Sequence, residues 1–175
     1  REKTNLILKE LCKLDKFPPG ACNVENLERS LAFIDSCSIL CEKWLQVIKP
    51  KAIFGNLYNE STTFALLVAA SRLRIPFIEI INGAMGRYHA HYTHWKNMPD
   101  SGYETYPDYI WTWDELSKFN IESHFPKNYR PHKAIVGGNY RLEHWLSQPN
   151  EPETHLGEYS FLKTLKKKSF VILIT

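Results

Sequence analysis

The residues best suited to do chemistry lie in one polar, glycine-containing segment, residues 82–92, which directly follows the apolar run at residues 77–81. An imidazole titrates near neutral pH, so His89 and His91 could move protons there. The guanidinium of Arg87 could bind a phosphate or a carboxylate. Polar loops at the exits of buried strands are where open α/β sheets bind their ligands, and we therefore interpret this loop as functional. The alternative is a solvated loop that holds two of the chain's seven histidines by chance.

The elements that must position this loop alternate between short apolar runs and helical patterns. Strands are predicted at residues 52–54, 77–81, 109–111 and 134–136. Helices are predicted from residue 61 or 62 to 74, where Pro76 follows, and at residues 114–120 and 140–146. Short strands separated by helices are typical of parallel βαβ units. The predicted fold class is therefore α/β, a Rossmann-like open parallel sheet flanked by helices.

Loops that follow parallel strands emerge at one edge of the sheet, whatever their separation along the chain. The polar side chains expected to share this edge are those of Asn56, Glu60, Asn82, His89, Thr112, Asp114 and Asn139. Glu60 directly precedes a predicted helix, whose dipole would keep the carboxylate ionised as a weak base or a ligand. Amides both donate and accept hydrogen bonds, so the three asparagines suit the recognition of hydroxyl groups. This convergence is the main evidence for a binding site.

The part of the chain before residue 50 is predicted to be helical. A short amphipathic helix is expected at residues 2–14, and the sequence Phe-Pro-Pro-Gly at residues 17–20 would end it. A much longer helix follows, with Asn23 as its N-cap and Pro50 as its limit. Apolar residues line one face of this helix, so we expect it to lie across the sheet.

The tail differs in composition from the rest of the chain. A polar, proline-bearing linker begins at residue 148, a helix is expected around residues 159–165, and a strongly apolar strand occupies residues 169–175. We assign residues 1–147 to one domain, 148–168 to the linker and helix, and 169–175 to the first strand of a second α/β domain in a longer parent chain. The alternative is that the last strand completes the first sheet.

Composition excludes several classes of protein. With 175 residues, 43% of them hydrophobic and 23% charged, the chain fits a globular domain, and a net charge of +3 gives no nucleic-acid footprint. The four cysteines lack paired spacing, which favours a reducing, cytoplasmic location. No apolar stretch reaches the length of a membrane span, and no GxGxxG follows a strand. A metal site at His89, His91 and His94 is disfavoured, because no cysteine or clearly placed carboxylate accompanies them.

Three motifs together resemble the amino-terminal half of bacterial GT-B glycosyltransferases that build capsule and lipopolysaccharide, a group more distantly similar to the glycerophosphotransferases of teichoic acid synthesis. The strand-exit loop of that family reads His-Gly, five residues, His, two residues, Tyr, and Gly83, His89 and Tyr92 fall on this frame. Residues 107–113 look like the strand before the short helix, and residues 136–139 look like the glycine-asparagine turn of the family. The likeness spans about residues 49–145.

The resemblance implies a function in surface-polysaccharide biosynthesis. The fold would be the acceptor half of a GT-B architecture, and the full-length enzyme would move a sugar from a nucleotide sugar to a growing polysaccharide or glycolipid. No cofactor is expected in this fragment, because the nucleotide sugar would bind mostly to a second domain, and the fragment alone is expected to be inactive. The parent would be cytoplasmic, at the inner face of the inner membrane as a peripheral protein, and the last strand could mediate a homodimer.

Under this resemblance, His89 is the first choice for the base that takes the acceptor proton, and Glu60 is the second. The residues expected to bind substrate are Asn56, Asn82, Gly83, Arg87, His91, Tyr92, Trp113 and Asn139, with the aromatic rings stacking on sugar faces or, alternatively, filling the core. The family usually has a histidine, thought to be the base in the related glycerophosphotransferases, where this chain has Asn82. The alternative function is therefore a non-catalytic sugar-binding or scaffold domain.

Overall fold

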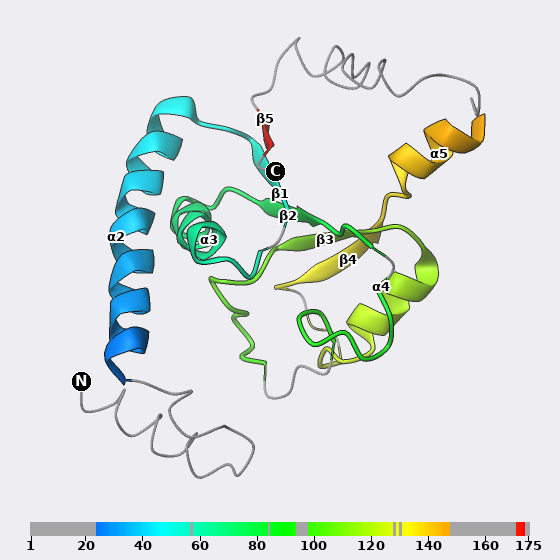
Figure 1. Cartoon of the computed structure of the whole chain (residues 1–175), viewed down its shortest axis with the longest axis horizontal. Coiled ribbons are helices and arrows are strands. Elements are labelled where there is room, and N and C mark those ends of the chain that lie inside the picture. The colour runs from blue at the N-terminus through cyan, green and yellow to red at the C-terminus, as the bar shows by residue number, and fades with distance from the viewer. Residues whose placement is uncertain are drawn as a thin grey trace.

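The computed structural model describes residues 24–56, 58–83, 85–93, 98–127, 129, 131–147 and 171–173. Within these residues the protein forms a five-stranded sheet in which every pair of neighbouring strands is parallel (Figure 1). The strand order is β4-β3-β2-β1-β5. The strands are β1 (Ala52–Gly55), β2 (Phe77–Ile80), β3 (Tyr109–Thr112), β4 (Lys133–Val136) and β5 (Val171–Leu173). The predicted α/β class and the four strands predicted between residues 52 and 136 are confirmed, each end within one residue.

The strands form where the sequence places apolar, β-branched or aromatic residues in short runs. Ile53 of β1 pairs with Phe77 of β2, and both side chains are fully buried. Ile110 of β3, also fully buried, pairs with Ala134 of β4. Alternate residues of β1 and β2 are buried on one face of the sheet and partly covered on the other, as expected for a sheet whose two faces are both in contact with protein.

The helices of the described residues are α2 (Val24–Ile48), α3 (Ser61–Leu73), α4 (Glu115–Glu122) and α5 (Tyr140–Ser147). The backbone N–H of Ser117 donates to Asp114 Oδ1 at 2.7 Å, so Asp114 is a side-chain N-cap and fixes the start of α4. The helix runs two residues beyond the predicted end. The helices expected at residues 2–14 and 159–165 lie outside the described residues.

The expectation that the long helix lies across the sheet is wrong. α2 packs along α3 instead (Figure 1). Six consecutive residues of α3, Ala65 to Ala70, are buried, and six residues cover every side of a helix. One side of α3 therefore faces the sheet and the other faces α2. The 25 residues of α2 span about 37 Å and a four-residue strand spans about 13 Å, so α2 is far longer than the strands.

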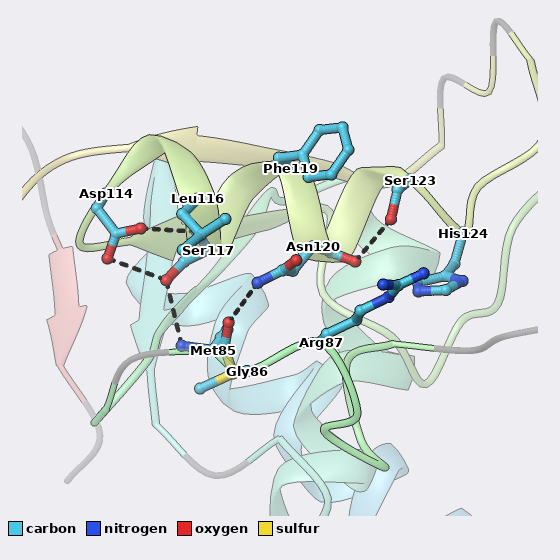
Figure 2. A pocket seen from close by; sticks show the side chains of 10 residues that line it. All are labelled: Met85, Gly86, Arg87, Asp114, Leu116, Ser117, Phe119, Asn120, Ser123 and His124. Carbon is cyan, nitrogen blue, oxygen red and sulfur yellow. Dashed lines mark hydrogen bonds between the residues drawn. The ribbon is translucent and has the colours of Figure 1, made fainter.

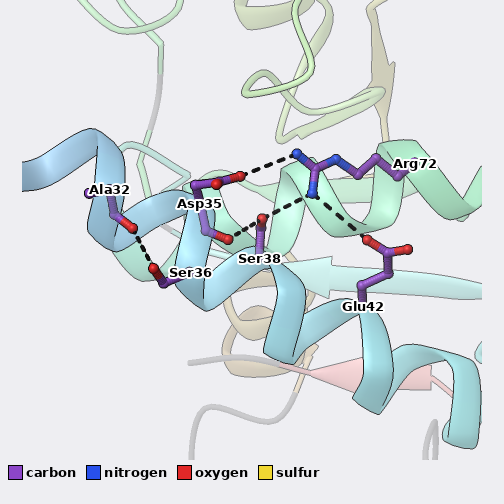
Figure 3. Close-up of polar contacts among 6 residues, drawn as sticks. All are labelled: Ala32, Asp35, Ser36, Ser38, Glu42 and Arg72. Carbon is purple, nitrogen blue, oxygen red and sulfur yellow. Dashed lines mark hydrogen bonds and ion pairs between the residues drawn. The ribbon is translucent and has the colours of Figure 1, made fainter. Parts of the chain in front are cut away.

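A single arginine links the two packed helices. Arg72 of α3 forms ion pairs with Asp35 at 3.5 Å and with Glu42 at 3.8 Å, both on α2 (Figure 3). Its guanidinium also donates to the hydroxyl of Ser38, which is fully buried between the helices, at 3.2 Å. The hydroxyl of Ser38 in turn donates to the carbonyl of Asp35. These contacts fix the register of α2 against α3.

The apolar strand near the end of the chain lies in the first sheet. Val171–Leu173 forms β5, which pairs in parallel with β1, with Ala52 opposite Val171 and Phe54 opposite Leu173. The sequence favours the first strand of a second domain, whereas this pairing corresponds to its alternative, an additional strand of the first sheet. The edge of β1 would otherwise present unpaired backbone groups, and β5 satisfies them. A domain beyond residue 175 stays a prediction, as does the assignment of residues 148–168 to a linker and helix.

Candidate functional site

The loops after β1 and β2 meet at the carboxyl edge of the sheet, as the parallel strands require. The hydroxyl of Tyr58, in the loop after β1, donates a hydrogen bond to the carbonyl of His91, in the loop after β2. The backbone N–H of Tyr58 donates to Glu79 Oε1 at 3.3 Å. The predicted convergence of residues 55–60 and 82–92 on one edge is therefore confirmed.

A buried glutamate anchors this edge. Glu79 is a residue of β2 and its side chain is 0% exposed. The hydroxyl of Tyr92 donates to Glu79 Oε1 at 2.7 Å, so the same oxygen accepts from both loops. Burying a carboxylate is costly unless donors surround it, and these two hydrogen bonds lower that cost. Glu79 therefore fixes the far end of the 82–92 loop to the sheet.

Three tyrosine rings surround this anchor. The ring of Tyr58 meets that of Tyr92 edge to face at 5.4 Å and that of Tyr106 at 5.1 Å between centroids. Burial raises the pKa of all three hydroxyls, and the coulombic effect of Glu79 raises each pKa further. The three tyrosines therefore stay protonated at neutral pH. The cluster supplies hydrogen-bond donors and packing rather than a base.

The half-buried imidazole of His89 packs against this tyrosine cluster through the ring of Tyr92. Its ring lies 5.0 Å from that of Tyr92 and 5.7 Å from that of His91, between centroids. Burial, followed by the neighbouring His91, lowers the pKa of His89 from its ordinary value of 6.5. The ring is therefore neutral at pH 7. Its Nδ1 atom is buried and has no hydrogen-bond partner among the described residues. A neutral imidazole carries one unprotonated nitrogen and can therefore accept a proton.

Other predicted site residues lie near the edge in different environments. Glu60 is exposed at the N-cap of α3, with no side-chain capping bond. Asn82 and His91 are exposed, while Asn56 and Gly83 are half-buried. Of these five residues, His91 has a ring contact with His89, at 5.7 Å between centroids.

Two aromatic residues expected to stack on sugars make hydrogen bonds within the fold. Tyr92 is only 6% exposed, because its ring packs in the core and its hydroxyl binds Glu79, and so stacking on a sugar does not fit its position. The indole N–H of Trp113 donates to the carbonyl of Ile81 at 3.1 Å. This bond joins the ends of β2 and β3, so Trp113 holds neighbouring strand exits together.

The glycine-asparagine turn after β4 is built around Trp111. The indole N–H of Trp111 donates to the carbonyl of Gly138 at 3.0 Å, and a Cβ at Gly137 would overlap the indole ring. Gly138 has φ +78°, a conformation that favours glycine. The side chain of Asn139 accepts from the backbone N–H of Leu142 at 3.0 Å. Asn139 therefore caps α5, a contact that occupies the amide oxygen expected to recognise hydroxyl groups.

The near end of the 82–92 loop is held by α4. The backbone N–H of Met85 donates to the hydroxyl of Ser117 at 3.2 Å, and Asn120 Nδ2 donates to the carbonyl of Met85 at 2.9 Å (Figure 2). A cavity of about 920 Å³ lies between this stretch and α4. Arg87 of the loop and His124, just after α4, both line it (Figure 2).

Sequence reasoning missed two residues of this site. Glu79 was predicted only as part of a strand, although a single acidic residue inside an apolar run is a signal that could have identified it. Tyr106 contributes its ring from a segment whose sequence carries no comparable signal. Among the described residues, no group of three or more His, Cys, Asp or Glu side chains could hold a metal ion.

Comparison with protein-family models, with curated proteins and with solved structures finds no match to the chain. Within the described residues, no helix combines the length and the apolar character needed to cross a bilayer. The arguments for function therefore rest on the geometry of the carboxyl edge and on the motifs in the sequence.

Proposed function

We propose that this chain is the acceptor-side half of a glycosyltransferase that transfers a sugar from a nucleotide sugar to a polysaccharide or glycolipid of the bacterial surface. The observation that carries the proposal is the half-buried imidazole of His89, which packs against the ring of Tyr92 at the carboxyl edge of a parallel sheet. This edge is where open α/β sheets bind substrates. The frame formed by Gly83, His89 and Tyr92 supports the choice of reaction.

In the proposed reaction, His89 removes the proton from an acceptor hydroxyl. The freed oxygen forms a bond to the anomeric carbon of the donor sugar, and the bond from that carbon to the diphosphate breaks, with its electron pair leaving on the diphosphate. The nucleotide would bind to a second domain of the parent chain. The lowered pKa of His89 fits this role, because a base must be unprotonated at the working pH.

Glu60 is the second candidate for the base. It lies at the N-cap of α3 on the same edge, but its side chain is exposed to solvent and makes no capping bond. A solvated carboxylate is a weaker base than an imidazole, and this favours His89. A ligand for the hydroxyl groups of a sugar is the role that fits Glu60 better.

A non-catalytic, sugar-binding role is the second candidate function, and Asn82 favours it. Asn82 is exposed directly after β2. The GT-B glycosyltransferases that this chain resembles usually have a proton-accepting histidine at this position. An amide cannot take a proton at neutral pH. Acceptor binding without turnover by the full-length parent would support this alternative.

The deciding experiment compares His89→Ala and Glu60→Gln in the full-length parent enzyme. Loss of a general base costs about a hundredfold to ten-thousandfold, so His89→Ala should lower kcat by at least about a hundredfold with the fold intact. Glu60→Gln keeps size and hydrogen bonding while removing charge, and it should act mainly on the apparent affinity for the acceptor. Abolition of transfer by Glu60→Gln, with kcat of His89→Ala nearly unchanged, would assign the base to Glu60 instead.

A further inference from the structure

The cavity beside α4 has two chemically different ends. At one end, both carboxylate oxygens of Asp114 accept from Ser117, one from the backbone N–H at 2.7 Å and one from the hydroxyl at 3.1 Å. The side chains of Arg87 and His124, which both line the cavity, are seen on the side of the view opposite Asp114 (Figure 2). The negative charge of Asp114 is therefore directed to the first turn of α4, away from the basic end.

The guanidinium of Arg87 is available to a ligand. Among the described residues, Arg87 has no carboxylate partner, and its recorded contact is with the ring of Tyr88, 5.8 Å from the centroid. Arg72 provides the contrast, since two carboxylates and a hydroxyl occupy its guanidinium. A guanidinium presents paired N–H donors that match the oxygens of a phosphate or a carboxylate. The basic end of the cavity therefore suits an anion.

The walls of the cavity suit the remainder of a sugar. Phe119 is 66% exposed and Leu116 is 67% exposed, three residues apart on α4, so both lie on one side of the helix and line the cavity. An exposed ring of this kind can pack against the apolar face of a pyranose. The floor is held by a buried hydrogen bond, which Asn120 Nδ2 donates to the carbonyl of Met85 at 2.9 Å.

We propose that this cavity binds an anionic carbohydrate, with its phosphate or carboxylate on Arg87 and His124 and its ring against Phe119. The inference rests on the proposed function and deepens it, because it identifies the acceptor as an acidic sugar. The anion would anchor the acceptor at α4, and the neighbouring part of the same glycan would extend along the loop toward His89.

The test uses the 175-residue chain and isothermal titration calorimetry with four probes: glucose 6-phosphate, glucuronate, glucose and inorganic phosphate. Both acidic sugars should bind at least about tenfold more tightly than glucose, since hydrogen bonds to charged groups contribute more than neutral ones. Arg87→Ala should weaken their binding about tenfold or more, and Arg87→Lys should weaken it less. Lys118→Ala is the matched control, because it removes a positive charge from α4 at a position that does not line the cavity.

Three outcomes would overturn the proposal. These are equal affinity for glucose and the acidic sugars, unchanged binding in Arg87→Ala, and equal losses in Arg87→Ala and Lys118→Ala. Affinity for inorganic phosphate as high as for glucose 6-phosphate would overturn the role of the sugar ring. Arg87 is exposed, so its variants should unfold at the temperature of the unsubstituted chain, and this is measured alongside.

The failure of this proposal can be distinguished from failure of the proposed function. Binding of acidic sugars that depends on Arg87, in a parent without transferase activity, would support the cavity and contradict the enzyme. Transfer that depends on His89, with no binding at the cavity, would support the enzyme and contradict the acidic acceptor.

Discussion

The two ends of the 82–92 loop are held by different chemistry. At the far end, Tyr92 is fixed by a buried carboxylate, Glu79, through a bond of 2.7 Å. At the near end, Met85 is fixed by the neutral side chains of Ser117 and Asn120 on α4. Between these anchors, Arg87 and His91 are exposed and His89 is half-buried. Fixed ends with accessible residues between them are what a binding loop needs, because the scaffold limits its motion while its side chains meet the ligand.

The difference between the two anchors predicts how substitutions at each one will affect the stability of the domain and of the loop. An anchor in which one buried acceptor oxygen serves two loops contributes strongly to stability while intact, because its loss leaves two donors without an acceptor. An anchor made of neutral hydrogen bonds contributes less, and its loss is felt locally. Damage at Glu79 should therefore affect the whole domain, and damage at Asn120 should mainly affect the cavity.

The largest effect is expected from Glu79→Ala. This substitution removes the acceptor of the Tyr92 hydroxyl and of the Tyr58 N–H and opens a cavity in the core, so it should lower the free energy of unfolding by about 3 kcal/mol. Glu79→Gln keeps an acceptor oxygen at the same position and should cost about 1 kcal/mol. Urea unfolding of the 175-residue chain measures both values.

Equal losses from the two substitutions at Glu79 would show that its charge, rather than its acceptor oxygen, holds the far end of the loop. A loss below about 0.5 kcal/mol for Glu79→Ala would contradict the anchor itself, because surface substitutions have effects of that size.

A smaller effect is expected at the near end. Asn120→Ala removes one buried hydrogen bond to the carbonyl of Met85 and should lower the free energy of unfolding by about 1.5 kcal/mol. It should also weaken the binding of glucose 6-phosphate, because the floor of the cavity loses its support. Ser123→Ala, in an exposed residue that lines the same cavity, is the control and should change stability by less than about 0.5 kcal/mol. Unchanged sugar binding in Asn120→Ala would argue against a role for this anchor in the cavity.

The sheet could be predicted from the sequence because its signal is local. Runs such as residues 52–54 and 109–111 carry apolar side chains and end at polar or glycine residues, and this suffices to place a strand. The parallel arrangement followed from the helices between them, and it placed the loops at one edge. The partner of α2 could not be predicted, because an apolar face on a helix does not say whether a sheet or another helix will cover it.

The site could be predicted only in part, because its contacts join residues that are distant along the chain. The position of His89 followed from the loop after β2, but its support did not. The bond from Tyr58 to His91 joins two different loops, and the ring of Tyr106 reaches the cluster from a third segment. The buried imidazole of His132 accepts from the Tyr103 N–H at 2.9 Å, again across a long stretch of chain. Tertiary packing decides these partners.

The smallest effect is expected at the centre of the loop, between the two anchors. It is a change in the pKa of His89. Burial is the larger cause of the lowered pKa of His89, and the charge of His91 is the smaller one. His91→Asn removes the smaller cause, so the pKa of His89 should rise but stay below 6.5. In the parent enzyme kcat/KM should increase as the pH rises through this pKa, because the base must be neutral. His91→Asn should move that increase to higher pH.

The same lowered pKa has a consequence for stability. The unfolded chain takes up a proton at its ordinary pKa, whereas folded His89 takes one up only at lower pH, so folding stability should fall as the pH drops below about 6.5 toward the folded pKa. NMR titration of the His89 ring in the 175-residue chain measures the pKa directly, with His144→Asn, on the separate helix α5, as the matched control. A pKa above 6.5, or one that falls in His91→Asn, would contradict both the burial argument and the role of His89 as the base. A rise in His91→Asn without one in the control would confirm that His91 contributes to the lowered pKa of His89, beside the larger effect of burial.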